Sequence, residues 1–383
     1  MADDGVSKYR FGDYILVEHL GGGGFGTVYK ASNGKASDPP VALKICRPRD
    51  YLKGPERCRR YYDEERQHLK NLRGHQYFVQ YINDFELTQD EINALSSEGT
   101  LILKDLTIPS RGVDSRCLEP KPHPVTHCER GEKSLTEVDC LLVLVMDYYP
   151  NDLHQSWDRK HQNSFSMDYA MDVGKKIIEG MAHLHSMDPP LVHRDLNPGN
   201  IFLELDEKER GHPRIGDLGI SREWKIIERH DTQPPPPTDV RTAGWAPEDR
   251  PLDPDPPVDV YCLGQVLFWL FTNHLPYDKT DPNTRRLDAK VWDLNPDVPE
   301  LWAKVIDKCR ENKADDRYSD AREVLAVLND EITIDETAPI NNNAHSSKTL
   351  WVASFIMAVL IVLAASIYFN FRGSSNVSQI PVS

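Results

Sequence analysis

The strongest constraint on the fold is a polar run between apolar segments, which reads Val192-His-Arg-Asp-Leu-Asn-Pro-Gly-Asn200. It contains Asp195 and Asn200, and Asp217 follows further along the chain in a Gly-Asp-Leu-Gly segment. Carboxylate and amide oxygens are hard ligands that suit Mg²⁺, and a carboxylate can also orient a hydroxyl group. We therefore expect a fold in which these three side chains converge.

A glycine-rich turn separates two strand-like segments near the start of the chain, Tyr14–Leu20 and Thr27–Ala31. Gly21, Gly23 and Gly26 have the spacing G-x-G-x-x-G. Without a Cβ, such a turn lets backbone N–H groups approach phosphates closely. The motif alone also fits a flexible hairpin or a dinucleotide-binding turn. The latter expects a helix after the last glycine, where this chain has a strand-like Thr-Val-Tyr-Lys.

Lys44 lies within an apolar strand pattern, Val41–Cys46. A buried ammonium group without an anionic partner is costly, so the sequence predicts a carboxylate beside it. Glu65, in a charged, helix-favouring segment at 56–72, is the first candidate, and Glu64 is the alternative. A lysine on an edge strand that extends into solvent would need no such partner.

Taken in order, the glycine turn, the strand lysine, the His-Arg-Asp loop and the Gly-Asp-Leu-Gly segment resemble the motifs of the eukaryotic-type protein kinases. The likeness covers residues 14–330. It implies an α+β, bilobal protein kinase-like fold, with a small antiparallel β lobe that carries one helix and a larger helical lobe. The local patterns agree, because a buried-strand pattern at 140–149 precedes helix patterns at 167–186 and 260–271.

The resemblance implies a catalytic role for five residues. Asp195 would accept the proton of the substrate hydroxyl, and Lys44, paired with Glu65, would bind the α- and β-phosphates of ATP. Asn200 and Asp217 would hold Mg²⁺. Metal ions and donors placed in advance would then stabilise the charge that spreads over the phosphoryl oxygens during transfer.

The resemblance also implies which residues surround the nucleotide. The three motif glycines would cover the phosphates. Val28, Ala42 and Phe202 would enclose the adenine, with Met146 as gatekeeper and Asp147 at the start of the hinge.

Further matches lie downstream and separate protein kinases from small-molecule kinases of the same fold. Residues 246–248 resemble the Ala-Pro-Glu motif that closes the activation segment, and Arg317 would pair with Glu248. Asp259 would begin the helix that supports the catalytic loop. Arg194 suggests control by a phosphorylated activation segment, for which the candidate acceptors are Ser221, Thr232, Thr238 and Thr242.

Two residues depart from the family pattern. Asn197 stands where serine/threonine kinases usually carry the lysine that steadies the γ-phosphoryl group, and Leu218 replaces the phenylalanine of the Asp-Phe-Gly motif. A loop of the tyrosine-kinase type is absent, so serine/threonine specificity is favoured. The loss of the lysine supports one alternative, a pseudokinase that binds partners without catalysing transfer.

Two stretches stand apart from the kinase pattern. Residues 87–138 form a polar, proline- and cysteine-containing insertion, where Cys117, His123, His127 and Cys128 could bind zinc, although their spacing matches no standard pattern. Pro234–Pro237 would form a stiff extended arm that suits a proline-motif reader.

The C-terminal part predicts a membrane anchor. Residues 331–349 form a polar linker, 350–369 is a run without charge, and 370–383 is a short tail. The run is long enough to cross a bilayer as a helix, with a buried core helix as the alternative. The N-terminus lacks the apolar stretch of a signal peptide, so we expect a single-pass membrane protein with a cytosolic kinase domain. Ser354 and Ala358 form a small-xxx-small pair that could support a homodimer.

The sequence thus predicts an ATP- and Mg²⁺-dependent serine/threonine protein kinase that acts on protein hydroxyls at a membrane. The alternative is a membrane-tethered pseudokinase that acts as a scaffold. The chain carries 60 Asp and Glu against 45 Lys and Arg, a formal net charge of −15, which argues against a sequence-independent nucleic-acid binder.

Overall fold

The computed structural model describes residues 10–23, 26–35, 37–46, 55–88, 90–92, 140–159, 166–205, 211–219, 221–223, 244–247, 255–277 and 287–330. All of them belong to one unit of the chain, Met1–Thr333. The second unit, Ile334–Ser383, lies outside the described residues.

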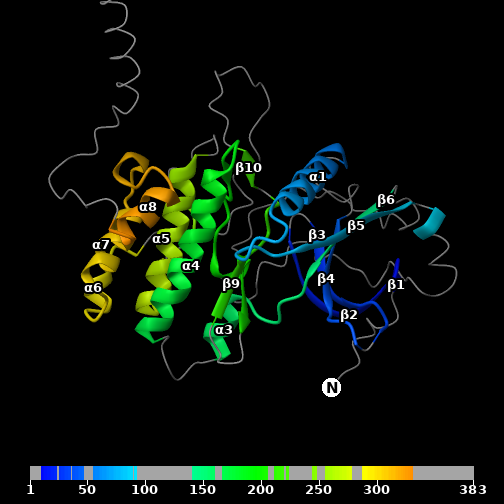
Figure 1. Cartoon of the computed structure of the whole chain (residues 1–383), viewed down its shortest axis with the longest axis horizontal. Helices are drawn as coiled ribbons and strands as arrows, with labels where there is room; N and C mark the ends of the chain where they lie inside the picture. The colour runs from blue at the N-terminus through cyan, green and yellow to red at the C-terminus, as the bar shows by residue number, and fades with distance from the viewer. Residues whose placement is uncertain are drawn as a thin grey trace, which may run out of the picture. The chain divides into compact units, whose positions relative to one another are not determined.

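Six antiparallel strands form a sheet in the N-terminal part, in the order β1-β2-β3-β4-β6-β5. Their bounds are β1 Arg10–Phe11, β2 Tyr14–Gly23, β3 Gly26–Ser32, β4 Val41–Cys46, β5 Tyr81–Thr88 and β6 Cys140–Asp147. Helix α1, Pro55–Asn71, lies between β4 and β5 in the chain and beside the sheet in space (Figure 1). The predicted strands and helix of this lobe are confirmed.

Strand β5 corrects the predicted start of the insertion. Its last residues, Leu87 and Thr88, pair with Leu141 and Cys140 on β6. The side chain of Ile92 is buried in the same core. The insertion therefore begins later than residue 87, because the sheet and its core already use these residues. Residues 93–139, with the four candidate zinc ligands, lie outside the described part.

The two faces of the sheet carry different side chains, because successive residues of a strand point to opposite faces. The odd-numbered residues of β3, β4 and β6 build an apolar core that includes Tyr29, Leu43 and Val145. The even-numbered residues share the opposite face, where Val28 lies opposite Lys44 and Ala42 lies opposite Met146. One face therefore holds the lobe together, and the other carries the predicted nucleotide residues.

The second lobe is mostly helical. Its helices are α3 Leu153–Arg159, α4 Met167–Ser186, α5 Pro256–Thr272, α6 Val291–Leu294, α7 Glu300–Cys309 and α8 Ala321–Leu328. Short strands carry the loops of the site: β7 Leu191–Val192, β8 Ile201–Leu205, β9 Gly211–Ile215 and β10 Arg222–Glu223. Helix α4 packs against α8, and α5 packs against α7 (Figure 1).

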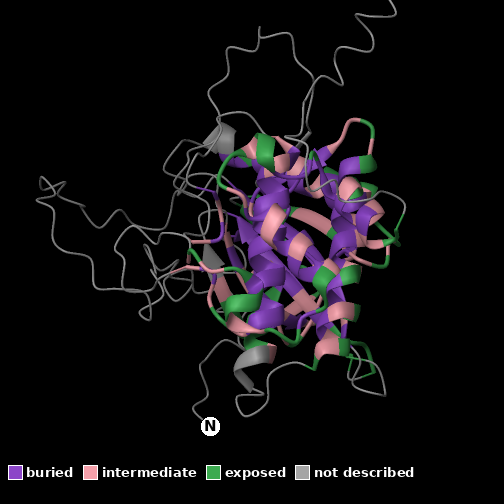
Figure 2. Cartoon of the chain, turned by 90° about the vertical axis from the view of Figure 1, so that its left-hand side faces the viewer, coloured by how far each residue is buried: buried purple, intermediate pink, exposed green. Residues whose placement is uncertain are grey.

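Helix α5 is the centre of this lobe. Nearly all of its residues are buried, consistent with its almost wholly apolar sequence, and buried residues run through the middle of the described part (Figure 2). It begins at Pro256, earlier than the predicted 260, because proline suits the first turn of a helix, where an N–H has no intrahelical partner. Helix α4 has the predicted bounds, and Ser166 caps it by accepting a bond from Tyr169 N.

The antiparallel sheet lobe and the helical lobe confirm the bilobal α+β prediction. Within the described residues, no helix has both the length and the apolar character that a bilayer crossing requires. The predicted linker at 331–349, the membrane segment at 350–369, the tail at 370–383 and the Pro234–Pro237 arm all lie outside the described residues.

Candidate functional site

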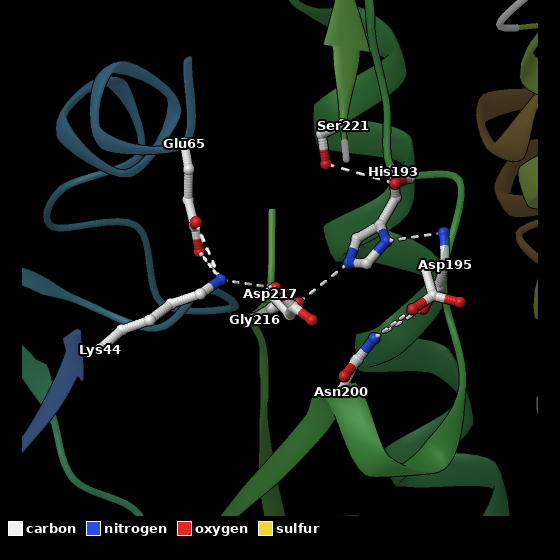
Figure 3. Close-up of polar contacts among 8 residues, drawn as sticks. All are labelled: Lys44, Glu65, His193, Asp195, Asn200, Gly216, Asp217 and Ser221. Carbon is white, nitrogen blue, oxygen red and sulfur yellow. Dashed lines mark hydrogen bonds and ion pairs between the residues drawn. The ribbon is translucent and has the colours of Figure 1, made fainter. Parts of the chain in front are cut away.

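Lys44 links the sheet lobe to the helical lobe. Strand β4 directs it away from the apolar core, where its Nζ lies 2.7 and 2.8 Å from the two carboxylate oxygens of Glu65 on α1. Both side chains are almost fully buried. Nζ also lies 3.0 Å from Asp217 Oδ1, which belongs to the other lobe (Figure 3). Of the two predicted partners, the structure selects Glu65 rather than Glu64.

The charges in this cluster fix its ionisation. Burial alone would lower the pKa of the Lys44 ammonium, but the carboxylates of Asp217 and Glu65 outweigh burial and raise that pKa. The charge of Lys44 lowers the pKa of Asp217 despite its partial burial. The lysine is thus cationic and Asp217 anionic near neutral pH, which are the states that binding a phosphate and a metal ion requires.

Asp217 occupies a left-handed backbone conformation, with φ 55°, just after β9. Such a conformation costs a non-glycine residue free energy and is often retained at functional sites. The preceding Gly216 donates its N–H to Asn200 O at 2.9 Å and accepts a bond from His193 Nε2 at 3.0 Å. The side chain of Asp217 is 43% exposed, so one face of the carboxylate remains accessible to a ligand.

Asp195 and Asn200 lie together in the loop between β7 and β8 (Figure 3). Asn200 Nδ2 donates to the Asp195 backbone oxygen at 2.8 Å and lies 3.2 Å from Asp195 Oδ2. Gly216 ties this loop to the segment that carries Asp217. The structure therefore brings Lys44, Glu65, Asp195, Asn200 and Asp217 into one region, as the sequence predicts.

A buried carboxylate beneath the loop holds its backbone. Asp259, on α5, accepts the N–H groups of His193 at 2.6 Å and Arg194 at 2.7 Å, and it lies 3.0 Å from His185 Nε2. His185 Nδ1 accepts the N–H of Ala321, so Nε2 carries the proton and donates it to Asp259. Burial alone would raise the pKa of Asp259, but the hydrogen bonds from His185 and from the Arg194 backbone N–H outweigh burial and lower that pKa.

This network extends the sequence prediction. Asp259 is where the family pattern expects a support for the loop, whereas sequence reasoning missed His185 and the bond from His193 to Gly216. For His185 the available signal was a histidine in the apolar stripe of α4, a position that requires a buried partner.

The residues predicted to surround the nucleotide lie along one side of this cluster. Gly21 and Gly23 are at the end of β2, where Gly23 pairs with Gly26. Gly26 has φ +148°, and a Cβ there would lie 2.7 Å from Ile45 O, so a side chain would not fit. The turn can thus stay close to β4 only with glycine at this position.

The residues predicted to enclose the adenine come from both lobes. Val28, Ala42 and Met146 share the even-numbered face of the sheet, and Asp147 ends β6. Phe202 lies on β8 of the other lobe, with its ring 6.1 Å from that of Tyr149.

Some predicted regulatory residues fall elsewhere. Thr232, Thr238, Thr242 and Glu248 lie outside the described residues, so the predicted ion pair with Arg317 does too. Ser221 is 2% exposed, and its hydroxyl donates to His193 O at 3.3 Å (Figure 3). Ser221 is thus part of the loop's packing, which argues against it as an exposed phosphate acceptor.

The donor set fits a nucleotide with Mg²⁺. Asn200 and Asp217 offer side-chain oxygens that could ligate the metal, and Lys44 offers a cation that could pair with phosphate. Among the described residues, no group of three or more His, Cys, Asp or Glu is arranged for a metal. A site completed by phosphate oxygens and water is typical of Mg²⁺.

Comparison with known proteins shows a family match over part of the chain. Residues 133–328 match the family model described as the protein kinase domain. The chain is 28% identical over 182 residues to a probable serine/threonine-protein kinase zyg-1 of Caenorhabditis briggsae, covering 47% of this chain and 23% of that protein. It is 28% identical over 185 residues to the serine/threonine-protein kinase VIK of Arabidopsis thaliana, covering 40% of each.

A third relative shows how partial these matches are. The probable serine/threonine-protein kinase pats1 of Dictyostelium discoideum is 29% identical over 184 residues, which are 46% of this chain and 6% of that protein. The chain thus spans well under half the length of each of the three. The family match begins after β5, so the placement of Lys44 and Glu65 rests on the contacts described above.

Proposed function

Because this chain belongs to the protein kinase family, we propose that it transfers the γ-phosphoryl group of ATP to serine or threonine hydroxyls of proteins. The observation that carries the proposal is the pair of bonds from Lys44 Nζ to Glu65 and Asp217, beside a loop that holds Asp195 and Asn200 together. A cation, a carboxylate suited to a metal ion and a candidate base thus lie on segments that hydrogen bonds and ion pairs join to one another.

Each residue has a distinct task in this proposal. Lys44 neutralises phosphate charge, and Glu65 holds the lysine in place. Asp195 orients the acceptor hydroxyl and takes its proton, while Asn200 and Asp217 supply ligands to Mg²⁺. When bound, Mg²⁺ would stabilise negative charge on the phosphate oxygens. Most of the acceleration would come from positioning and electrostatics, as in phosphoryl transfer generally.

The test is phosphate incorporation from labelled ATP by the purified full-length chain, with a generic basic protein and with the chain itself as acceptor. We expect Mg²⁺-dependent incorporation into serine and threonine, and a fall of at least about 10²-fold in Asp195→Asn, which removes the base. Unaltered activity in Asp195→Asn would contradict the proposal. Labelling confined to tyrosine would contradict the proposed specificity for serine and threonine.

The alternative function is a scaffold that binds nucleotide without transfer. It is favoured by Asn197, which removes the cation that the family usually places near the γ-phosphate. The discriminating result is Mg²⁺-dependent stabilisation by ATP without any phosphate incorporation. Such a result would favour the scaffold.

We also propose that residues 350–369 anchor the protein in a membrane, with the kinase domain in the cytosol. Support comes from the uncharged run between polar flanks. An arginine at the centre of such a helix costs about 2.5–3.5 kcal/mol on insertion, so Leu360→Arg combined with Leu363→Arg should release the chain on alkaline extraction. Ser374→Arg, in the tail, is the matched control. Equal extraction of both variants would contradict the anchor.

Two proposals on partners depend on residues outside the described part. Pro234–Pro237 would bind a reader of proline motifs, and the pair Ser354 and Ala358 would support a homodimer. Cross-linking of the full chain in detergent, with Ala358→Leu as the variant, tests the dimer. A proline-to-alanine replacement of 234–237 tests the reader in a binding assay with isolated SH3 and WW domains.

A further inference from the structure

Asn197 stands where serine/threonine kinases usually carry lysine, but its side chain is turned into the loop. The residue is 7% exposed. Its Nδ2 donates to Asp195 O at 3.0 Å, and its Oδ1 accepts the N–H of Gly199 at 2.9 Å. Both ends of the amide are thus engaged within the loop instead of extending toward a phosphate.

The backbone oxygen of Asp195 receives two amides. Asn197 Nδ2 donates at 3.0 Å and Asn200 Nδ2 at 2.8 Å. A carbonyl oxygen has two lone pairs, so these two donors satisfy it. Since Nδ2 of Asn200 is held here, its Oδ1 is the atom left to serve as a metal ligand. The position of this ligand is thus coupled to that of Asn197.

Asn197 also caps the 3-10 turn Pro198–Asn200. It has an extended backbone, with φ −153° and ψ 165°, and its side chain accepts the first N–H that the turn can offer, because Pro198 has none. A Cβ on Gly199 would lie 3.1 Å from Asn197 Oδ1, so the cap and the turn are in close contact. The side chain therefore fixes both the start of the turn and the backbone of Asp195.

We propose that Asn197 is a positioning residue that holds Asp195 and Asn200 in the geometry that Mg²⁺ and the acceptor hydroxyl require. Where lysine would supply a positive charge, Asn197 instead supplies hydrogen bonds that hold the loop in shape. This inference rests on the proposed function, because it concerns the same site, but it makes a separate statement about the loop without nucleotide.

The chain offers a matched control. Asn295 makes the same two kinds of bond in the helical lobe: its Nδ2 donates to Phe271 O at 2.8 Å, and its Oδ1 accepts the N–H of Asp297, two residues on, at 3.2 Å. Asn295→Ala therefore removes an equivalent pair of bonds far along the chain from the catalytic loop.

The first experiment is hydrogen exchange of the full chain in detergent, without nucleotide. In Asn197→Ser the hydroxyl can still cap the turn but cannot reach the Asp195 carbonyl, and Asn197→Ala removes both bonds. We expect exchange in residues 195–201 to accelerate at least about tenfold in the alanine variant and less in the serine variant. Asn295→Ala should leave exchange in 195–201 unchanged.

The second experiment is Mg²⁺ titration of ATP binding by calorimetry, followed by steady-state kinetics. Both Asn197 variants should need about three- to tenfold more Mg²⁺ for half-saturation and should lose about tenfold or more in kcat, because a misplaced ligand and base weaken the same step. Asn295→Ala should change the melting temperature only.

The outcomes separate the two proposals. If wild type binds Mg²⁺-ATP but the Asn197 variants keep its Mg²⁺ dependence and its exchange pattern, the positioning role is wrong and the kinase proposal stands. If Asn295→Ala shifts Mg²⁺ dependence equally, the effect is general destabilisation and the role is again wrong. If wild type binds no Mg²⁺-ATP, the kinase proposal fails and this positioning role fails with it.

Discussion

Single buried polar groups determine the shape of the loop that carries the proposed base, Asp195. Asp259 accepts two backbone N–H groups and the Nε2–H of His185, with none of the three exposed to solvent. A buried donor that loses its acceptor costs about 1–3 kcal/mol. The loop backbone is thus stabilised by one carboxylate from α5 in addition to the bonds that Asn197 and Asn200 make within the loop.

We predict that Asp259→Ala lowers the free energy of unfolding by about 3–5 kcal/mol, because it leaves these donors unpaired. The measurement is urea denaturation followed by circular dichroism. Glu300→Gln is the control, since it breaks only the exposed 2.9 Å pair with Lys304 and should cost about 0.5 kcal/mol or less. A loss below about 1 kcal/mol in Asp259→Ala would contradict this account.

The sequence predicted most of the side chains that form the site, but not the hydrogen bonds between them. A buried lysine requires a carboxylate, so Lys44 pointed to Glu65 or Glu64, and only the helix orientation decides between them. For Asn197 the sequence shows a missing charge, whereas the two loop bonds depend on backbone geometry that residue identity does not reveal.

At the scale of elements, the turn between α1 and β5 packs against α4 through two histidines. The rings of His75 and His183 are stacked, with centroids 3.9 Å apart. They line a cavity of about 470 Å³ together with Glu179 and Arg322. Arg322 is paired with Asp320, and Glu179 accepts a bond from the Tyr77 hydroxyl. Burial lowers the pKa of both histidines, and the neighbouring His183 lowers that of His75 further.

This contact should make stability depend on pH. A histidine whose pKa is lower in the folded chain takes up its proton first in the unfolded chain, so stability falls as pH drops below the ordinary value of about 6.5. We predict that the melting temperature of His183→Phe decreases less than that of wild type between pH 7.5 and pH 5.5. His19→Phe, at an exposed position, is the control. Parallel curves for wild type and His183→Phe would contradict the prediction.

For the whole molecule, the site is shared between two lobes, so a ligand that binds it should stabilise the fold. A ligand at one hundred times its Kd adds about 2.7 kcal/mol. We predict that Mg²⁺-ATP raises the melting temperature by about 4 °C or more. Lys44→Met should abolish the shift, whereas Lys290→Met, which removes an exposed lysine, should retain it. An undiminished shift in Lys44→Met would place the nucleotide elsewhere.

The overall outline was largely predictable from sequence, and the reason is periodicity. The apolar run at 41–46 and the helical apolar spacing at 167–186 match the observed elements. Strand β5 was missed because its pattern is polar at several positions, with only Tyr81 and Leu87 buried. Helix α3 was also unpredicted, since a helix of this length carries little periodic signal.

The pairing of β5 with β6 has a consequence for how this chain can be changed. Thr88 and Cys140 are register partners at one end of the sheet, so the backbone leaves and returns about 5 Å apart. Lengthening the connection costs little, because doubling a loop adds only about 0.6 kcal/mol of closure entropy. Provided that Ile92 is kept for the core, the connection after β5 is a site at which another domain can be inserted into the chain. Modules with neighbouring termini could be exchanged there while the proposed nucleotide site stays as it is.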